Sequence, residues 1–419
     1  MALLAIVAVL AAAVGAHSIS GADGPGQLPD RTATTATACG RSEVREACSE
    51  IEVAGRTWRY SLRRASPGTP NTALVDLGGP GTSVMSGANG LGHLPDTLPR
   101  LSADHNLLVI EEPWVLDPVP AACRAALSAY YVAMRSTWSM PDAVAGRLGS
   151  DCGVGRHDPQ WGFTPQTYDA VVHAIVEREG LVLDGFVGHS WGAVRLTYLT
   201  STTLRWATLL RPYPYAASLD DITAGRLQAL ASLTSSLNAQ MPASSASTTV
   251  EGRSVPVERF DLATSVVELG YVDDDVVQQF GAAVVTGTRP DKVGLLSDQY
   301  WGRYGVDDLS PRMLAFWDEA CPVAGASQDL VRSSSELARV VGLQFSPCQL
   351  FHERRAVRTP TGLAICVVYS KGDAVTPTAD ILRTYGGSND VVLKEVGVRA
   401  HPSMEGADAC MTGMRPSGA

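Results

Sequence analysis

The segment Gly185-Phe186-Val187-Gly188-His189-Ser190-Trp191-Gly192 carries the strongest structural signal in this chain of 419 residues. It contains the pattern G-x-S-x-G, which places a serine on a tight turn between a strand and a helix, with glycines that let the backbone approach closely. A short apolar run precedes the pattern, and residues 193–199 follow it as a plausible helix. The pattern alone is a weak signal, and an ordinary glycine-rich turn is the alternative. Its context favours a nucleophile at Ser190.

Apolar runs and helical patterns alternate along most of the chain. The short runs at residues 73–77, 106–110 and 363–369 each lead into a turn that contains Gly or Pro, which is typical of buried parallel strands. Residues 167–179 repeat apolar side chains at helical spacing. This alternation predicts an α/β fold with a mostly parallel sheet and helices on both faces. Together with the serine turn, it predicts an α/β-hydrolase fold.

Residues 212–359 interrupt this alternation. The segment is too long for one crossover helix, and helical patterns recur in it at residues 274–285 and 311–319. A Ser- and Ala-rich stretch at residues 243–248 indicates a loop. We therefore expect an inserted helical cap over the carboxyl edge of the sheet. The predicted organisation is a signal peptide at residues 1–16, a lead-in at 17–50, a hydrolase core at 51–211 and 360–419, and the cap at 212–359.

The composition is that of an ordinary globular protein. Apolar residues make up 45% of the chain and charged residues 18%, so the chain can bury a sizeable core. The formal net charge of −10 argues against nucleic acids and anionic membrane surfaces as partners. We expect a small-molecule or short-peptide substrate, no nucleic-acid partner and no stable membrane span.

The N-terminus and the cysteines favour a secreted, extracellular protein. Residues 2–16 form an apolar run that ends in small residues, typical of a secretory signal peptide, and the run is shorter than the roughly 20 residues of a membrane span. No Lys or Arg precedes it, so the true start could lie upstream; a buried N-terminal helix is the alternative. Eight cysteines without a C-x-x-C pair favour disulfides over a metal site. Many pairings are possible; pairing each cysteine with its neighbour in sequence suggests Cys39–Cys48, Cys123–Cys152, Cys321–Cys348 and Cys366–Cys410.

A nucleophilic serine needs a base and an acid that orients the base. In α/β-hydrolases these residues follow in the chain order Ser, acid, His. Two histidines lie after the start of the cap segment, His352 and His401, and only His401 follows a good acid candidate, Asp373, in the turn after an apolar run. The sequence therefore predicts a catalytic triad of Ser190, Asp373 and His401. Weaker acid candidates are Asp380, Asp390 and Asp408.

The oxyanion hole of such an enzyme needs two backbone N–H groups. One is expected from Trp191, the residue after the nucleophile, and the other from the loop Gly78-Gly79-Pro80-Gly81, at Gly79. A simple turn is the alternative for this loop. His189 is expected to be structural, with its side chain directed away from the site.

The loop Leu77-Gly78-Gly79-Pro80-Gly81 resembles the H-G-G-P-G loop of the proline iminopeptidase and tripeptidyl aminopeptidase family of α/β-hydrolases, with Leu77 in place of the histidine. Glu112-Pro113 followed by Cys123, the serine turn and residues 372–377 match the family in the same order, and the similarity runs from about residue 39 to the C-terminus. The resemblance implies a secreted serine hydrolase with a helical cap that removes N-terminal residues or short peptides.

The same resemblance implies that carboxylates bind the amino group of the substrate. Glu111, Glu112 or the cluster Asp273-Asp274-Asp275 could serve, although each is better explained as a solvated or structural acid.

Three functions remain open from the sequence. The first is an aminopeptidase-like exopeptidase that acts through an acyl-enzyme on peptide N-termini. The second is a carboxylesterase, lipase or thioesterase on the same triad, favoured by the altered loops and by Trp114 and Trp191 near the site. The third is a non-catalytic binding protein of the same fold. No metal-ligand spacing, phosphate loop or dinucleotide fingerprint occurs, so we expect no metal ion and no cofactor.

Overall fold

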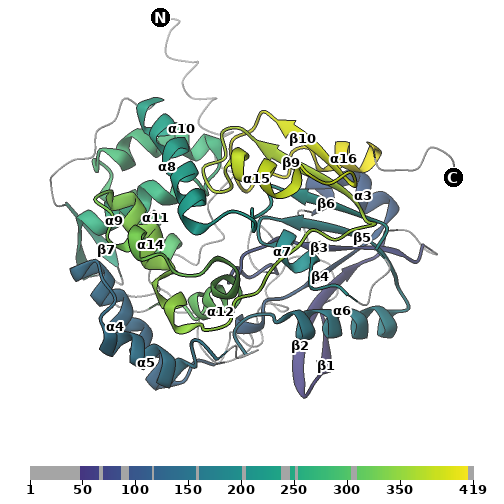
Figure 1. Ribbon diagram of the computed structural model, residues 1–419, viewed down its shortest axis with the longest axis horizontal. Helices are drawn as coiled ribbons and strands as arrows, with labels where there is room; N and C mark the ends of the chain where they lie inside the picture. Colours follow the sequence, from purple (N-terminus) through teal and green to yellow (C-terminus); the bar gives the residue numbers. More distant parts are fainter. Residues whose placement is uncertain are drawn as a thin grey trace, which may run out of the picture.

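A computed structural model describes residues 48–65, 69–85, 94–115, 118–156, 160–200, 204–236, 246–250, 253–302 and 309–413. The predicted signal peptide and Cys39 lie outside these residues. An eight-stranded sheet forms the centre of the molecule (Figure 1). In spatial order its strands are β1 (Cys48–Val53), β2 (Arg56–Arg63), β4 (Asn106–Ile110), β3 (Asn71–Asp76), β5 (Val182–His189), β6 (Trp206–Leu210), β9 (Ala364–Ser370) and β10 (Val391–Val396).

The sheet is mostly parallel, as predicted. β2 pairs antiparallel with both β1 and β4. Every other pairing in this sheet is parallel, including those of β5 with β3 and β6. The strand that leads to Ser190 thus lies in the interior of the sheet, between two parallel neighbours. This topology, with helices on both faces and a helical insertion, is the α/β-hydrolase fold.

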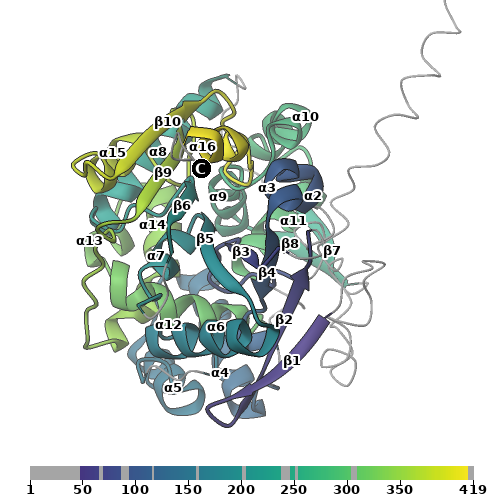
Figure 2. The same ribbon diagram turned by 90° about the vertical axis from the view of Figure 1, so that its right-hand side faces the viewer.

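Both faces of the sheet are covered, and successive residues of a strand pack on opposite faces. In β3, Ala73 and Val75 belong to the same buried cluster as Leu101 and Ala407, whereas Leu74 belongs to the other buried cluster, which also contains Ile381. One face is covered by α2 (Leu94–Thr97), α3 (Pro99–Asp104) and α16 (Ala407–Gly413), and α16 lies beside α3 in Figure 2. The other face is covered by α6 (Pro165–Glu179), α7 (Gly192–Leu196) and α15 (Thr378–Tyr385).

A helical insertion lies between β6 and β9, as the sequence predicted. The helical pattern at 274–285 is α10 (Asp274–Val285), and the pattern at 311–319 extends further, as α12 (Arg312–Ala324). The loop predicted at residues 243–248 is wrong from residue 246 onward, because β7 (Ala246–Val250) pairs there with β8 (Arg253–Val257). The other helices of the insertion are α8 (Leu219–Ser236), α9 (Arg259–Glu268), α11 (Pro290–Trp301), α13 (Gln328–Val331) and α14 (Glu336–Gln344).

A helical hairpin from the first half of the chain packs against this insertion. It consists of α4 (Ala121–Thr137) and α5 (Asp142–Cys152), which Figure 1 shows next to α9, α12 and α14. The Tyr130 hydroxyl donates to the Leu343 carbonyl at 2.5 Å, and Arg135 pairs with Asp261 at 2.6 Å. No sequence pattern indicated this contact, because it joins segments more than a hundred residues apart.

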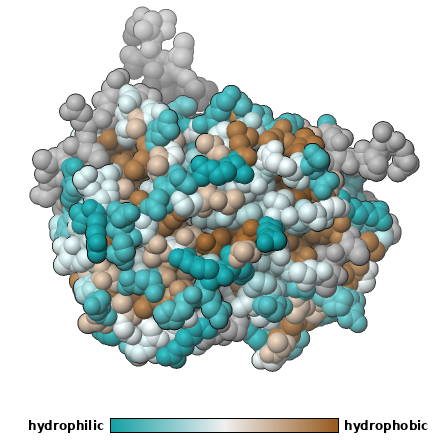
Figure 3. Space-filling model, viewed as in Figure 1, coloured by the Kyte–Doolittle hydropathy of each residue, from teal (hydrophilic) through white to brown (hydrophobic). Residues whose placement is uncertain are grey.

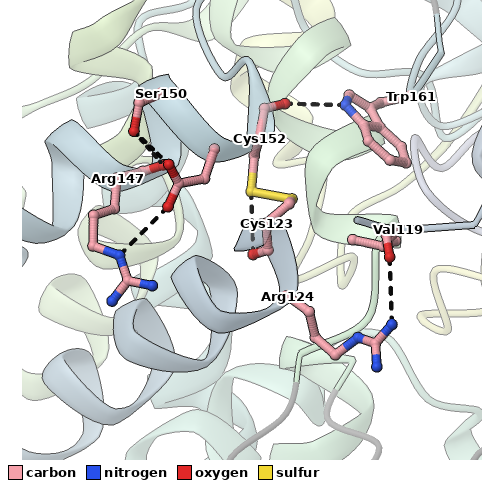
Figure 4. The surroundings of a disulfide bond; sticks show 8 residues. Val119, Cys123, Arg124, Arg147, Ser150, Cys152 and Trp161 are labelled. Atoms are coloured by element: carbon pink, nitrogen blue, oxygen red, sulfur yellow. Dashed lines mark hydrogen bonds and ion pairs between the residues drawn. A yellow bond between two sulfur atoms is a disulfide. The ribbon is translucent and has the colours of Figure 1, made fainter. Parts of the chain in front are cut away.

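Three of the predicted disulfides are present. Cys123–Cys152 joins α4 to α5 (Figure 4), Cys321–Cys348 joins α12 to the short helix Ser346–Leu350, and Cys366–Cys410 joins β9 to α16. The proposed partner of Cys48, Cys39, lies outside the described residues.

The surface mixes hydrophilic side chains with smaller apolar patches on the face shown in Figure 3. None of the helices in the described part of the chain has both the length and the apolar character needed to cross a bilayer.

Removal of the Cys366–Cys410 disulfide should destabilise the fold markedly. The bond closes a segment of 44 residues and ties the helix after His401 to the sheet. Loss of such a link typically costs about 2–4 kcal/mol, because the unfolded chain gains freedom. We expect Cys366→Ala/Cys410→Ala to lower the free energy of urea unfolding by this amount. An unchanged unfolding midpoint would contradict this role for the bond.

Candidate active site

Ser190 lies on a strained turn at the carboxyl end of β5. Its φ of +51° is unusual for a residue with a side chain. The turn is held by two backbone hydrogen bonds of Ser190, from its N–H to Leu210 O and from Tyr213 N–H to its carbonyl, both 2.9 Å. A Cβ at Gly192 would lie 2.7 Å from the carbonyl oxygen of Asp76, so this position requires glycine. The G-x-S-x-G segment therefore forms the strand–turn–helix that its pattern indicates.

The loop at residues 77–81 packs directly on this turn. A Cβ at Gly78 would lie 2.3 Å from the carbonyl oxygen of His189 and 3.1 Å from the backbone nitrogen of Trp191. The loop is anchored from the other side, since Gly78 N–H donates to Asp76 Oδ1 at 2.9 Å. Backbone from two distant segments thus meets beside Ser190.

His401 is held by Asp373. The distance from His401 Nδ1 to Asp373 Oδ2 is 2.9 Å. Asp373 also accepts hydrogen bonds from Val375 N–H at 2.7 Å and Thr376 N–H at 3.0 Å. Burial alone would raise the pKa of Asp373, but the neighbouring His401 and these hydrogen bonds outweigh it and lower the pKa. The ionised carboxylate accepts a hydrogen bond from Nδ1–H of His401. His401 Nε2 has no partner among the described residues.

Ser190, His401 and the loop of Gly79 line one cavity of about 370 Å³. Asp373 lies behind His401 and does not line it. Trp191 contributes only its backbone to this region, because its side chain is buried and its indole N–H donates to Glu319 at 3.1 Å. Neither Trp191 nor Trp114 lines the cavity, so the expectation of tryptophan side chains near the substrate is wrong.

His189 does not point away from the site. Its ring contacts that of His401, with centroids 4.8 Å apart, and its Nε2 lies 2.7 Å from the His401 carbonyl oxygen. Its Nδ1 lies 3.3 Å from the carbonyl oxygen of Leu77. Burial, followed by the charge of His401, lowers the pKa of His189 to about 4, so the ring is neutral at pH 7 and has one N–H to donate. His189 can therefore donate to only one of these two carbonyl oxygens, and the shorter contact is the one with His401.

The carboxylates expected to bind an amino group are engaged elsewhere. Glu111 is fully buried and accepts hydrogen bonds from Ser83 and from the backbone of the adjacent loop. Glu112 pairs with Arg195 at 2.7 Å, and Asp274 pairs with Arg399 at 3.0 Å. None of the acids at 111, 112 or 273–275 lines the cavity, which agrees with the alternative that they are structural or solvated acids.

A different carboxylate, Glu268 at the end of α9, lines the cavity. The residue is 4% exposed, and its carboxylate forms no hydrogen bond or ion pair within the described part of the chain. Burial raises its pKa to about 8, although the charge of Arg312 opposes this shift. No motif surrounds Glu268 in the sequence, and its place depends on how α9 packs over the sheet.

Sequence comparisons identify no family, since no family model and no curated protein matches the chain. Similar solved structures include Est816, described as an N-acyl homoserine lactone degrading enzyme (12% identity, 87% of this chain and 99% of that chain, TM-score 0.42). A proline iminopeptidase-related protein from Thermus thermophilus has 12% identity over 88% of this chain and 98% of that chain, with a TM-score of 0.42. Naproxen esterase from Bacillus subtilis has 9% identity over 93% of this chain and 99% of that chain, with a TM-score of 0.38. Likenesses this weak add nothing to what the sheet topology establishes.

Proposed function

We propose that this protein is a serine hydrolase whose nucleophile, base and acid are Ser190, His401 and Asp373. One observation carries the proposal: a serine on a strained strand–helix turn shares a cavity with a histidine whose far nitrogen is bonded to a buried carboxylate. Each feature has a structural explanation alone, but their convergence is what nucleophilic catalysis requires.

The geometry suggests an acyl-enzyme mechanism. Ser190 Oγ attacks the substrate carbonyl while His401 Nε2 takes its proton, and the Asp373 carboxylate stabilises the resulting imidazolium. The N–H groups of Trp191 and Gly79 are proposed to bind the oxyanion. His401 then protonates the leaving group. In the second step His401 takes a proton from water, which attacks the acyl carbonyl, and the proton is returned to Ser190 Oγ as the acyl group leaves.

For the substrate, we favour a peptide or aminoacyl compound with a free amino group, which Glu268 would bind. An unpaired carboxylate inside the cavity is costly unless a cation joins it. An ammonium group would lower the pKa of Glu268 and form the missing ion pair. The rings of Tyr271 and Tyr300 also line the cavity and can face such a cation. This points to an aminopeptidase-like exopeptidase.

An esterase is the second candidate, because part of the cavity wall is apolar. Met313, Phe316 and Met404 lie on this wall, and a protonated Glu268 would tolerate an uncharged acyl chain.

We further propose that the protein is secreted, since three disulfides are most stable in an oxidising compartment.

Replacement of the nucleophile tests the mechanism. We expect Ser190→Ala to lower kcat on the order of 10⁶-fold on whichever of aminoacyl anilides or p-nitrophenyl esters the protein cleaves, and to abolish labelling by a fluorophosphonate. Ser83→Ala is the matched control, because it removes another serine of the same cavity and should still react with the probe. Turnover of Ser190→Ala near the wild-type rate would end this mechanism, and no turnover or labelling of the wild type would favour a non-catalytic binding protein.

Neutralising Glu268 tests the amine site. We expect Glu268→Gln to raise KM about 10-fold or more for anilides with a free N-terminus, which corresponds to the loss of one charged hydrogen bond. N-acetylated anilides and esters should be affected little. The exposed Glu353→Gln removes the same charge elsewhere and should leave KM unchanged. Equal changes on free and blocked substrates would exclude Glu268 as the amine-binding residue.

The same substitution should change stability in a pH-dependent way. The pKa of Glu268 is raised by burial from 4.5 to about 8, so its protonated form is favoured in the folded state. Its contribution to stability is therefore complete below pH 4.5 and is lost as the pH rises through about 8. Glu268→Gln cannot ionise, and its unfolding temperature should exceed that of the wild type at about pH 8 and approach it toward pH 4.5. The opposite trend would show that the carboxylate is stabilised in its ionised form.

A further inference from the structure

Arg195 lies one turn after Ser190 and contacts three carboxylates. Its guanidinium is 2.7 Å from Glu112 Oε1, 2.7 Å from Glu319 Oε1 and 3.4 Å from Asp76 Oδ1. All four side chains are buried. We refer to Arg195, Asp76, Glu112 and Glu319 as the Arg195 cluster.

Burial favours the protonated form of Glu112 in this cluster, because three buried negative charges around one cation would be costly. Burial raises the pKa of Glu112 to about 8; the charge of Arg195 opposes this rise, whereas those of Glu319 and Asp76 add to it. Glu112 Oε2 has no partner among the described residues.

The cluster contacts both backbone segments of the proposed oxyanion hole. On one side, Asp76 Oδ1 accepts from Gly78 N–H at 2.9 Å, and a Cβ at Gly79 would lie 3.3 Å from Glu112 Oε1. On the other side, Glu319 accepts from the indole N–H of Trp191 at 3.1 Å. None of the four clustered side chains lines the cavity, so they cannot contact a substrate held there.

We propose that the Arg195 cluster positions the oxyanion hole. It holds the loop of Gly79 and the turn of Trp191 in a fixed relative position, and Glu319 connects cap helix α12 to the loop and the turn. The inference rests on the proposed serine-hydrolase function. Its members are positioning residues, which act through the backbone N–H groups of other residues.

Glu319 is the residue of the cluster whose hydrogen bonds cannot all be kept by a conservative substitution with glutamine. Its Oε1 accepts from Phe163 N–H and Arg195 Nη2, and its Oε2 accepts from the indole of Trp191 and Arg195 Nε. A glutamine has a single oxygen, so in either orientation its NH₂ group would face two donors. The matched control replaces an exposed glutamate outside the cluster and outside the cavity lining, Glu353→Gln.

The experiment measures kcat, KM and the inhibition constant of a boronic acid that forms a tetrahedral adduct with Ser190, all at pH 7. Loss of one oxyanion donor costs about 10²–10³-fold in kcat. We expect Glu319→Gln to lower kcat about 10²-fold and to weaken the boronate by a similar factor, with KM changed by less than about 3-fold. Glu353→Gln should stay within about 3-fold of the wild type in kcat, KM and the inhibition constant.

Several outcomes decide against the inference. The inference is overturned if folded Glu319→Gln keeps the wild-type kcat. It is also overturned if the kcat of this variant recovers fully on cooling, because that result would show that the substitution had lowered only the fraction of folded protein. Should Glu319→Gln not fold, Trp191→Phe removes the indole donor to Glu319 but keeps the ring; it should lower kcat and boronate affinity together, and wild-type values would overturn the inference. A wild type that neither turns over substrate nor reacts with a fluorophosphonate would instead refute the proposed function.

Discussion

The rest of the site depends on the backbone contact between the loop at 77–81 and the turn at Ser190. The contact leaves no room for a Cβ at Gly78, and it is possible only because Ser190 adopts a positive φ at the end of an interior strand. Such a conformation costs about 1–3 kcal/mol and persists where the surroundings enforce it. Here the surroundings are parallel neighbours on both sides of β5 and the two hydrogen bonds that join Ser190 to Leu210, at the end of β6, and to Tyr213, just after it. A rigid sheet thus maintains a conformation that the serine would not adopt alone.

Charged groups are buried on two sides of the backbone contact between the loop at 77–81 and the turn at Ser190, and they differ in whether they have partners. Behind the turn, Arg195 is saturated by acceptors, and its acids are bonded to backbone and side-chain donors. Such an arrangement defines one geometry, because any displacement leaves a buried charge uncompensated. In front of the turn, Glu268 lacks a partner within the described part of the chain and lines the cavity. A saturated cluster favours rigidity, whereas an unpaired carboxylate is available to a ligand.

The sequence predicted those features that are encoded locally. The glycines around Ser190, the turn that contains Asp373 and the strand–helix alternation are each visible within a few residues, and the mostly parallel sheet and the inserted cap were confirmed by the structure. The structure brings His401 to Asp373, although their catalytic role stays a prediction. The sequence did not identify an amine-binding acid, because exposure and partners decide whether a carboxylate is available, and these are set by packing. Glu268 and the α4–α5 hairpin could not be found, since each depends on contacts between segments distant in the chain.

The cap and the sheet are joined where a shift would disturb the site most. Helix α12 carries Glu319 on the side that meets Arg195, and its Cys321 is bonded to Cys348. From Cys348 the chain continues to β9, which leads into the turn of Asp373, and β9 is itself bonded to α16 through Cys366. These two disulfides therefore lie along the path that connects the cap to Asp373 and His401. Because buried carboxylates such as Glu112 and Glu268 cost stability, covalent links at these positions offset that cost and also limit movement of the cap relative to Ser190.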